Sequence, residues 1–277
     1  MEKHLLHKQL AAFLAEDIGR GDLTSESIFS PEQTGSARLV ARQPCLVAGV
    51  ATVAAEVFHI QNEATICENC LADGQEVVPG MVLMTVRGPV VDLLKAERVA
   101  LNLLQRLCGI ATLTNQYARL IAGTNARIVD TRKTTPGLRL LEKYAVTVGG
   151  GGNHRYNLAD GVLVKDNHIA ACGGITTAVA RLRRRVPHTL RIEVECDDLE
   201  QVADCLACGV DCILLDNMTP DMLRQAVALI DGRALAEASG GVNLGTVAEI
   251  AGTGVDLISV GAITHSVPYC DIGMDWL

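Results

Sequence analysis

The residues best suited to chemistry lie between positions 127 and 169. Short apolar or glycine-rich runs there are each followed by side chains that can carry positive charge, namely Arg132, Lys133, His154, Arg155 and Lys165. Buried strands of α/β proteins are short apolar runs, and the residues just beyond their C-terminal ends build the site. The full chain has a net charge of -8, so composition does not explain this local excess of cations. We therefore expect these side chains to converge on one anionic ligand.

Each of these cations suits an acidic ligand in its own way. Arg132 and Arg155 can each grip a carboxylate with two parallel hydrogen bonds. Lys133 and Lys165 act as point charges and suit phosphate or a second carboxylate. His154 can donate a hydrogen bond or carry a positive charge. A single cation at a strand end usually forms a surface salt bridge, but five of them favour a binding site.

Carboxylates and small turns follow the later apolar runs. Glu195 and Asp216 close two successive runs. They can act as a general acid–base pair, bind Mg²⁺ or accept sugar hydroxyls, and the alternative is pairing with the lysines. Small glycine-containing turns occupy 239–243 and 259–263. Barrels commonly bind phosphate at such turns through backbone N–H groups, so the pattern indicates a phosphate site.

Alternating strands and helices must position these residues. Apolar runs predict strands at 128–130, 162–165, 192–195, 213–216, 235–239 and 257–260. Helical patterns fall at 175–185, 199–209, 220–230 and 244–251. Such alternation predicts a parallel sheet. Since six units are fewer than the eight of a complete barrel, we expect an incomplete parallel α/β barrel.

The N-terminal part of the chain has a different pattern. It predicts a helix at 2–16, a loop at 17–24, a strand at 35–43, a short helix at 49–60 and two short strands around the Pro-Gly turn within 73–88. A long helical pattern covers 90–122, and Gly109 is expected to divide it into two helices. The predicted domains are therefore 1–108 with the linking helix, 109–266 for the barrel, and a C-terminal tail, 267–277, that returns to the first domain.

Composition and charge limit the class of protein. A chain of 277 residues with 49% hydrophobic residues and 26 glycines suits a well-packed α/β enzyme. Apolar runs stay below about 18 residues and the N-terminus lacks a signal-peptide core, so we expect a cytoplasmic protein. The acidic balance argues against nucleic-acid or membrane partners. The basic run at 181–185 is expected to be the solvated end of a helix.

Ten cysteines raise the question of metal binding. Disulfides are not expected in a reducing cytoplasm. Cys67 and Cys70, like Cys205 and Cys208, have CxxC spacing, but a zinc site would require these distant pairs to meet. Cys205 and Cys208 fall on the helical pattern at 199–209, where cysteines usually serve as small buried hydrophobes. The sequence leaves open whether Cys67 and Cys70 bind metal.

Almost the whole chain resembles the quinolinate phosphoribosyltransferase family. The shared motifs are EDIGRGDLTS at 16–25, AERVALN at 96–102, DTRKTTPG at 130–137, GGGGNHR at 149–155, KDNH at 165–168, EVE at 193–195, LDN at 215–217, EASGG at 237–241 and SVGA at 259–262. The resemblance implies an N-terminal α/β sandwich domain and an incomplete barrel of the type II phosphoribosyltransferase kind. It also implies at least a homodimer, in which Arg98 of one subunit enters the other's site.

The reaction that the resemblance implies joins quinolinate to phosphoribosyl pyrophosphate, giving nicotinate mononucleotide, CO₂ and pyrophosphate in de novo NAD biosynthesis. Quinolinate would contact Arg98, Arg132, His154, Arg155 and Lys165. The phosphoribosyl donor would contact Lys133, Lys165, Glu195, Asp216, Ser239, Gly240, Gly241 and Gly261. Thr131, Ser259 and Val260 are further residues expected to bind substrate. Lys133, Lys165, Glu195 and Asp216 are the expected catalytic residues. Glu195 and Asp216 are also expected to hold Mg²⁺, directly or indirectly.

Other functions remain compatible with parts of the pattern. A phosphoribosyltransferase for nicotinate or another planar acid would need fewer cations than this chain supplies. A related protein of molybdate transport loci shares some motifs, but the complete NHR and KDNH motifs favour the quinolinate enzyme. A noncatalytic sensor on the same fold would be expected to lack Lys133, Glu195 or Asp216, and all three are present. A zinc-binding structural protein is the alternative that the CxxC pairs leave.

Overall fold

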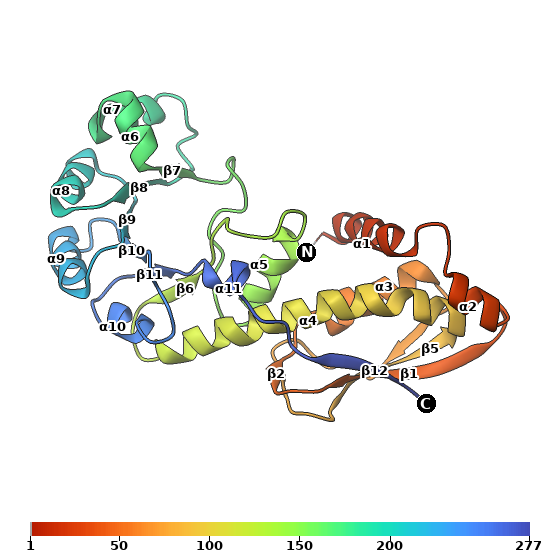
Figure 1. Cartoon of the computed structure of the whole chain (residues 1–277). Coiled ribbons are helices and arrows are strands. Elements are labelled where there is room, and N and C mark those ends of the chain that lie inside the picture. The colour runs from red at the N-terminus through yellow and green to blue at the C-terminus, as the bar shows by residue number, and fades with distance from the viewer. Residues whose placement is uncertain (1) are drawn as a thin grey trace. The chain divides into compact units, whose positions relative to one another are not determined.

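The computed structural model describes residues 2–277, and contacts divide the chain into two units (Figure 1). The first unit holds the residues up to 113 together with 140–149 and 267–277, and the second holds 114–139 and 150–266. The second unit therefore contains every predicted site residue except Arg98.

The first unit is built on an antiparallel sheet. Its strand order is β12 (Ile272–Trp276), β1 (Thr34–Ala41), β5 (Val82–Pro89) and β3 (Ile66–Glu68). The C-terminal strand β12 pairs with β1, so residues from both ends of the chain share this sheet. The two strands predicted around the Pro-Gly turn are present but do not pair with each other, because β4 (Glu76–Val77) pairs with β2 (Cys45–Leu46).

Helices supply the other layer of the first unit. They are α1 (Lys3–Ile18), α2 (Leu23–Ile28), the π-helical turn Val50–Ala54, α3 (Ala55–Gln61), α5 (Arg139–Val148) and the first part of α4 (Val90–Leu120). Leu10, Phe58 and Leu93 from these helices are fully buried, as are Leu39 and Leu83 from the strands. Burial of such apolar side chains is the main favourable term in folding, so these residues form the core of the unit.

The predicted helix break at Gly109 is wrong. Helix α4 is continuous from Val90 to Leu120, and the predicted domain boundary after residue 108 lies inside it. A Cβ atom at Gly109 would lie 2.3 Å from the carbonyl oxygen of Pro268. The absence of a side chain at Gly109 therefore allows the segment around Pro268 to pack closely against the helix, and the glycine does not end the helix.

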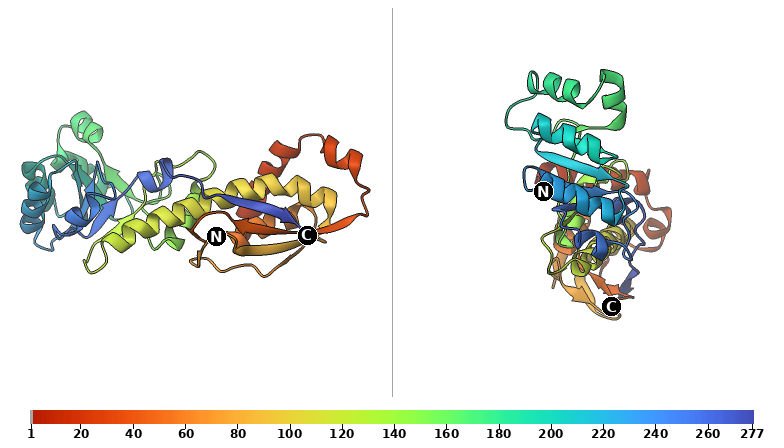
Figure 2. Two further views of the ribbon diagram at one scale, coloured as in Figure 1. Left: turned by 60° about the horizontal axis from the view of Figure 1, so that its bottom comes forward. Right: turned by 90° about the vertical axis from the view of Figure 1, so that its left-hand side faces the viewer.

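The second unit contains a six-stranded parallel sheet, and all six predicted strands are present. The order is β6 (Arg127–Val129), β11 (Leu257–Ser259), β10 (Leu235–Ser239), β9 (Cys212–Asp216), β8 (Ile192–Cys196) and β7 (Val162–Val164). Helices α7 (Ile175–Arg183), α8 (Leu199–Cys208) and α9 (Pro220–Ile230) lie along the outer side of the strands (Figures 1 and 2). The shorter helices are α6 (Asp166–Cys172), α10 (Val247–Ala251) and α11 (Ala262–His265). This arrangement confirms the predicted incomplete α/β barrel.

The glycine-rich motif occupies the open side of the barrel, between the edge strands β6 and β7. The Gly152 N–H donates to the carbonyl oxygen of Ile128 at 2.7 Å, and the Asp130 N–H donates to that of Gly152 at 3.1 Å. Three residues on, Nη1 of Arg155 donates to the carbonyl oxygen of Gly161 at 2.8 Å, just before β7. The motif thus carries His154 and Arg155 alongside the sheet.

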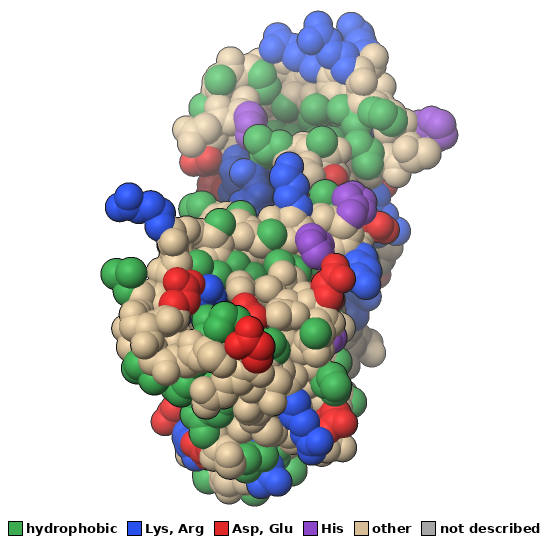
Figure 3. All heavy atoms as spheres, turned by 90° about the vertical axis from the view of Figure 1, so that its right-hand side faces the viewer, with side chains coloured by type: hydrophobic (Ala, Val, Ile, Leu, Met, Phe, Trp, Pro, Cys, Tyr) green, Lys and Arg blue, Asp and Glu red, His purple; other side chains and the backbone are tan. Residues whose placement is uncertain are grey.

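The exposed surface mixes charges of both signs. On the face in Figure 3, lysine, arginine and carboxylate side chains are interspersed, apart from one basic group at the upper edge. Arg181 and Arg183 lie in the exposed last turn of α7, as predicted for the basic run. Between residues 2 and 277, every helix is too short or too polar to cross a membrane.

Candidate active site

A cavity of about 350 Å³ lies at the C-terminal ends of the barrel strands. It is lined by the residues that follow these strands, together with a few strand residues: Thr131, Arg132, Lys133, His154, Arg155, Leu163, Lys165, Glu195, Leu214, Asp216, Glu237, Ser239 and Ser259. All five cations and both carboxylates singled out in the sequence therefore meet in one cavity. The C-terminal ends of the strands are also where the active sites of parallel α/β barrels lie.

Residues outside the predicted site hold the loop after β6 in place. Arg139 donates from Nε to the Thr134 hydroxyl at 2.9 Å and from Nη2 to the carbonyl oxygen of Arg132 at 3.3 Å. The Thr264 hydroxyl donates to the carbonyl oxygen of Lys133 at 2.8 Å. These bonds fix the backbone of Arg132 and Lys133, so their side chains extend into the cavity from a braced loop.

Asp130 anchors the segment that carries His154 and Arg155. It is fully buried at the end of β6 and accepts hydrogen bonds from Asn153 Nδ2 at 2.7 Å and from the His154 N–H at 2.8 Å. The Arg155 N–H donates to Nδ1 of His154 at 2.8 Å. Since Nδ1 accepts this bond, the proton of the neutral imidazole sits on Nε2.

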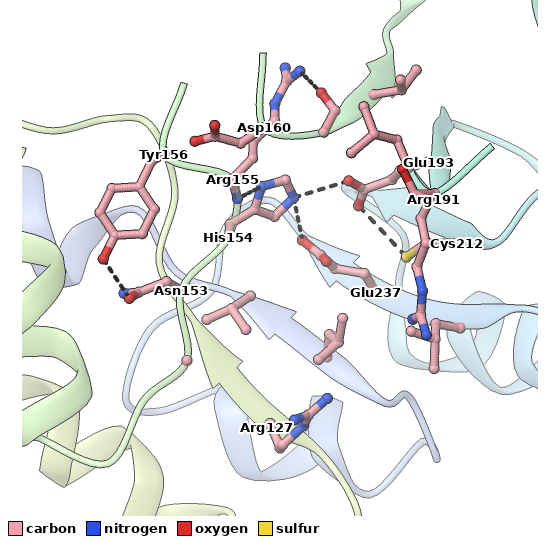
Figure 4. A pocket seen from close by; sticks show the side chains of 18 residues that line it. Arg127, Asn153, His154, Arg155, Tyr156, Asp160, Arg191, Glu193, Cys212 and Glu237 are labelled. Carbon is pink, nitrogen blue, oxygen red and sulfur yellow. Dashed lines mark hydrogen bonds and ion pairs between the residues drawn. The ribbon is translucent and has the colours of Figure 1, made fainter. Parts of the chain in front are cut away.

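The Nε2 atom of His154 faces two buried carboxylates inside the barrel (Figure 4). It lies 3.0 Å from Oε2 of Glu193 and 3.9 Å from Oε1 of Glu237. Burial and the adjacent charge of Glu193 raise the pKa of Glu237 to about 7. We expected the His154 ring to donate toward the ligand, whereas its two nitrogens make these contacts within the barrel.

A second cavity, of about 770 Å³, opens at the opposite ends of the same strands. Its wall includes Arg127 and Cys212 (Figure 4). Leu235 also lines it, and all three are the first residues of their strands. His154 and Glu237 line both cavities. The cluster of His154, Glu193 and Glu237, called here the imidazole–carboxylate cluster, therefore lies in the barrel between its two mouths.

Arg132 and Arg155 each hold a buried donor with no acceptor. The Nε atoms of both side chains are buried and have no hydrogen-bond partner within residues 2–277. Burial and the nearby charge of Arg132 lower the pKa of Arg155. Buried polar groups are normally hydrogen-bonded, and two guanidinium groups repel each other. Their arrangement therefore favours an anionic ligand that accepts from both.

The two predicted carboxylates differ in their partners. Nζ of Lys165 lies 2.5 Å from Oε2 of Glu195, so this carboxylate is paired with a lysine. Asp216 instead accepts a hydrogen bond from Nδ2 of Asn217 at 2.6 Å. Within residues 2–277 Asp216 forms no ion pair. Of the two carboxylates, Asp216 is therefore the one whose charge is available to a hydroxyl donor or a cation.

Glycine turns follow β10 and β11, as predicted. Gly240 has a φ of +89°, and a Cβ atom there would lie 2.1 Å from Oδ1 of Asn217. Gly261 leaves space for Cδ of Lys133, which would lie 3.1 Å from such an atom. Val260 does not offer its N–H to a ligand, because that group donates to the carbonyl oxygen of Val129 at 2.9 Å.

Arg98 and the cysteine pairs lie apart from this cavity's lining. Arg98 is exposed on α4 in the first unit. Cys205 is fully buried with its Sγ 3.4 Å from that of Cys196, as predicted for a small hydrophobe. Burial raises the pKa of Cys67 to about 12 and also raises that of Cys70. Among residues 2–277, the group with metal-site spacing is the imidazole–carboxylate cluster, which contains no cysteine.

A partial α/β barrel with cations, carboxylates and glycine turns at its strand ends has the parts that a phosphoribosyl donor and an acidic acceptor require. Lysines suit pyrophosphate, carboxylates suit ribose hydroxyls, and backbone N–H groups in turns suit a terminal phosphate. The fold and the site define a phosphoribosyltransferase of the partial-barrel class.

Family models then specify which phosphoribosyltransferase this is. The N-terminal domain of quinolinate phosphoribosyl transferase matches residues 22–108, and its C-terminal domain matches residues 110–275. The chain belongs to the quinolinate phosphoribosyltransferase family.

Individual relatives agree with this assignment. The chain is 47% identical over 270 residues to a probable nicotinate-nucleotide pyrophosphorylase (carboxylating) of Bacillus subtilis, which covers 98% of this chain and 93% of that protein. Identity to the Mycobacterium leprae nicotinate-nucleotide pyrophosphorylase (carboxylating) is 44%, covering 95% and 94%. The crystal structure of nicotinate-nucleotide pyrophosphorylase from Ehrlichia chaffeensis superimposes with a TM-score of 0.92 at 41% identity, covering 100% and 99%.

Proposed function

We propose that this cavity transfers phosphoribosyl from phosphoribosyl pyrophosphate to quinolinate with decarboxylation, giving nicotinate mononucleotide, CO₂ and pyrophosphate in NAD biosynthesis. Membership of the family supports the reaction. The observation that carries the assignment to this cavity is the pair of buried, unpartnered Nε donors of Arg132 and Arg155. Quinolinate has carboxylates on adjacent ring carbons, and guanidinium groups match carboxylates with directed hydrogen bonds. A monocarboxylate would leave part of this donor set unused.

The phosphoribosyl donor occupies the remainder of the cavity in this proposal. Lys133 and Lys165 attract the pyrophosphate as point charges, with Thr131 beside them. Asp216 accepts hydrogen bonds from ribose hydroxyls. The 5′-phosphate is bound by the turns after β10 and β11, through Ser239, Gly240, Gly241, Ser259 and Gly261.

Transfer begins with the departure of pyrophosphate from C1′ of the ribose. The C–O bond breaks with oxocarbenium character at C1′, and the pyridine nitrogen of quinolinate supplies the electron pair for the new bond. Lys133 stabilises the negative charge that grows on the leaving group. Lys165 acts at the same place while Glu195 holds its ammonium in position at 2.5 Å.

Magnesium fits the residues at this end of the barrel. Glu195 and Asp216 supply hard carboxylate oxygens, and Mg²⁺ in nucleotide sites is commonly held by one or two carboxylates and substrate phosphates. Asp216 is the better candidate because Glu195 is already paired with Lys165. When bound, Mg²⁺ neutralises charge on the pyrophosphate.

Decarboxylation follows from the charge created by the transfer. The pyridine nitrogen becomes cationic once bonded to C1′, so it stabilises the electron pair left on the adjacent ring carbon when CO₂ departs. Arg132 and Arg155 hold the two carboxylates in orientation before this step. A proton then replaces CO₂ on that carbon.

The subunit arrangement and location extend this proposal. An exposed arginine on α4, Arg98, is available to enter the site of a second subunit in a homodimer and to contact quinolinate there. The reaction uses soluble phosphorylated metabolites, so a cytoplasmic location suits it.

A direct assay tests the proposal. Purified protein is mixed with phosphoribosyl pyrophosphate, Mg²⁺ and either quinolinate or nicotinate, and nicotinate mononucleotide and CO₂ are measured. Product from quinolinate alone, lost in Lys133→Ala and Arg155→Ala, is the expected result. Product from nicotinate alone would contradict the proposal that Arg132 and Arg155 recognise a dicarboxylate. No product from either acid would favour a noncatalytic sensor. Omission of Mg²⁺ in the presence of a chelator should abolish turnover.

A further inference from the structure

The imidazole–carboxylate cluster is the feature of the barrel that the proposed reaction does not use. Glu193 and Glu237 are 8% and 1% exposed, respectively. Taking carboxylates out of water is costly unless each is paired. The basic group closest to them is the ring of His154, which lines the substrate cavity and directs Nε2 at both. Because these buried carboxylates are costly and contact a residue of the cavity, we expect them to have a role in the site.

A metal ion is the first role to consider. The ligand atoms of His154, Glu193 and Glu237 lie within 4.8 Å of one another. A metal-bound imidazole normally donates an N–H from its other ring nitrogen. Here the other nitrogen, Nδ1, accepts the N–H of Arg155 at 2.8 Å. A metal at Nε2 would therefore require a doubly deprotonated ring, so the cluster suits hydrogen bonding better.

The cluster connects instead to the backbone of Arg155. Glu193 accepts from Nε2 of His154 at 3.0 Å, and Nδ1 of the same ring accepts the Arg155 N–H at 2.8 Å. Asp130 fixes the other side of the segment by accepting the His154 N–H at 2.8 Å. Both ring nitrogens of His154 are thus held, and Arg155 is the next residue in the chain.

The position of the Arg155 backbone determines where its guanidinium group lies in the cavity. That side chain lines the cavity and spans toward β7 through its bond to Gly161 at 2.8 Å. Its Nε donor is buried and without an acceptor among residues 2–277. A guanidinium binds a carboxylate well only when its planar donors are correctly placed.

We propose that Glu193 is a positioning residue for quinolinate binding: it fixes the His154 ring from inside the barrel, and the ring fixes the backbone from which Arg155 extends. The inference rests on the proposed function. Glu237 lies farther from the ring, at 3.9 Å, and supports the same orientation less directly. Glu193 lies outside the lining of the substrate cavity and acts through His154.

A double-mutant cycle tests this linkage. Glu193→Ala is expected to raise KM for quinolinate by about tenfold or more, the effect of losing a hydrogen bond to a charged group. KM for phosphoribosyl pyrophosphate should stay within about twofold. Glu193→Gln should restore most of the affinity, since the amide oxygen still accepts the Nε2 proton. In a His154→Ala background, Glu193→Ala should add little, because residues that act through one another are not additive.

Several outcomes would overturn the positioning role. Equal increases in KM for both substrates would assign Glu193 to general stability. Additive effects of the two alanine substitutions would show that Glu193 acts independently of His154. Wild-type protein that makes no product from quinolinate would instead defeat the proposed function itself, so the two failures are distinguishable.

A measurement independent of activity covers the case in which Glu193→Ala does not fold. The ring nitrogens of His154 are observed by ¹⁵N NMR in wild type and in Glu237→Gln, with His154→Gln used for assignment. A proton on Nε2 and none on Nδ1 is expected in both proteins. A proton on Nδ1 would contradict the inferred chain of contacts.

Discussion

Nζ of Lys165 lies 2.5 Å from Oε2 of Glu195, so the cation that follows β7 and the carboxylate of β8 neutralise one another within the cavity. The side chains of Lys165 and Glu195 are 47% and 13% exposed, so water reaches the lysine end of the pair, and ion pairs open to solvent contribute only about 0–1 kcal/mol to stability. We therefore expect the pair to matter more for substrate binding and turnover than for the stability of the fold.

Replacing Lys165 should affect turnover far more than stability. Lys165→Met keeps the length of the side chain and removes the charge, so kcat/KM is expected to fall by about 100-fold, equivalent to about 3 kcal/mol. The free energy of unfolding should change by less than about 1 kcal/mol. Steady-state kinetics and urea unfolding measure the two effects. Arg224→Met, which breaks the exposed pair with Asp221 at 2.6 Å on α9, is the matched control and should leave kcat/KM unchanged.

Arg155 should not be replaceable by lysine. A lysine keeps the positive charge but loses the planar set of donors, and it cannot reproduce both the bond to Gly161 and an Nε donor. Arg155→Lys is expected to raise KM for quinolinate by about 10- to 100-fold. Arg224→Lys serves as the control on an exposed helix. Wild-type affinity in Arg155→Lys would show that charge alone recognises the acid.

Glu237 should make stability depend on pH. Burial and the charge of Glu193 raise its pKa from 4.5 to about 7. The folded protein therefore keeps this proton to higher pH than the unfolded chain, and its stability falls as pH rises from 4.5 to 7. The penalty above pH 7 is on the order of 3 kcal/mol. The groups that face Glu237 are Glu193 on β8, Cys212 on β9, Ser259 on β11 and the ring of His154.

Glu237→Gln removes this ionisation and so tests the sign of the effect. The variant should match wild type in unfolding free energy below pH 4.5 and exceed it progressively up to pH 7 and above, as measured by urea unfolding at a series of pH values. Glu200→Gln on the exposed face of α8 is the control. A variant that is less stable than wild type at about pH 8 would contradict the assigned burial penalty.

Gly240 should tolerate no side chain. Its φ is +89°, and a Cβ atom would overlap Oδ1 of Asn217, which follows Asp216. Gly240→Ala is expected to cost about 2–4 kcal/mol of stability through backbone strain and overpacking, and to raise KM for phosphoribosyl pyrophosphate. Gly232 has a φ of +69°, and a Cβ atom added there would meet nothing within 4 Å. Gly232→Ala isolates the backbone term, about 1 kcal/mol, and should leave KM unchanged.

The parallel strands were predictable because each is marked by the residue types within a short stretch of the chain. Apolar runs such as 213–216 and 235–239 are short, buried and followed by polar residues, and all six predicted strands appear in one sheet. The same logic placed Lys165, Glu195 and Asp216 at strand ends, since the carboxyl ends of parallel strands meet at one edge. The cavity unites them as expected.

The break at Gly109 could not be judged from local sequence. Glycine lowers helix propensity, which favoured a break. The structure instead uses the missing side chain for the approach of Pro268, a residue far along the chain. A contact between positions so widely separated leaves no signal in the spacing around either one.

The sequence by itself determined the alternation of strands and helices and the chemical character of the cavity, because both depend on residue type and near-neighbour spacing. Tertiary structure alone decided the partners of the charged groups. Glu193 and Glu195 alternate with Val194 on β8 and look equivalent in sequence, yet one contacts His154 and the other Lys165. The depth of each carboxylate in the barrel sets its partner, and depth arises only when β7, β8, β10 and the glycine-rich segment have come together in space.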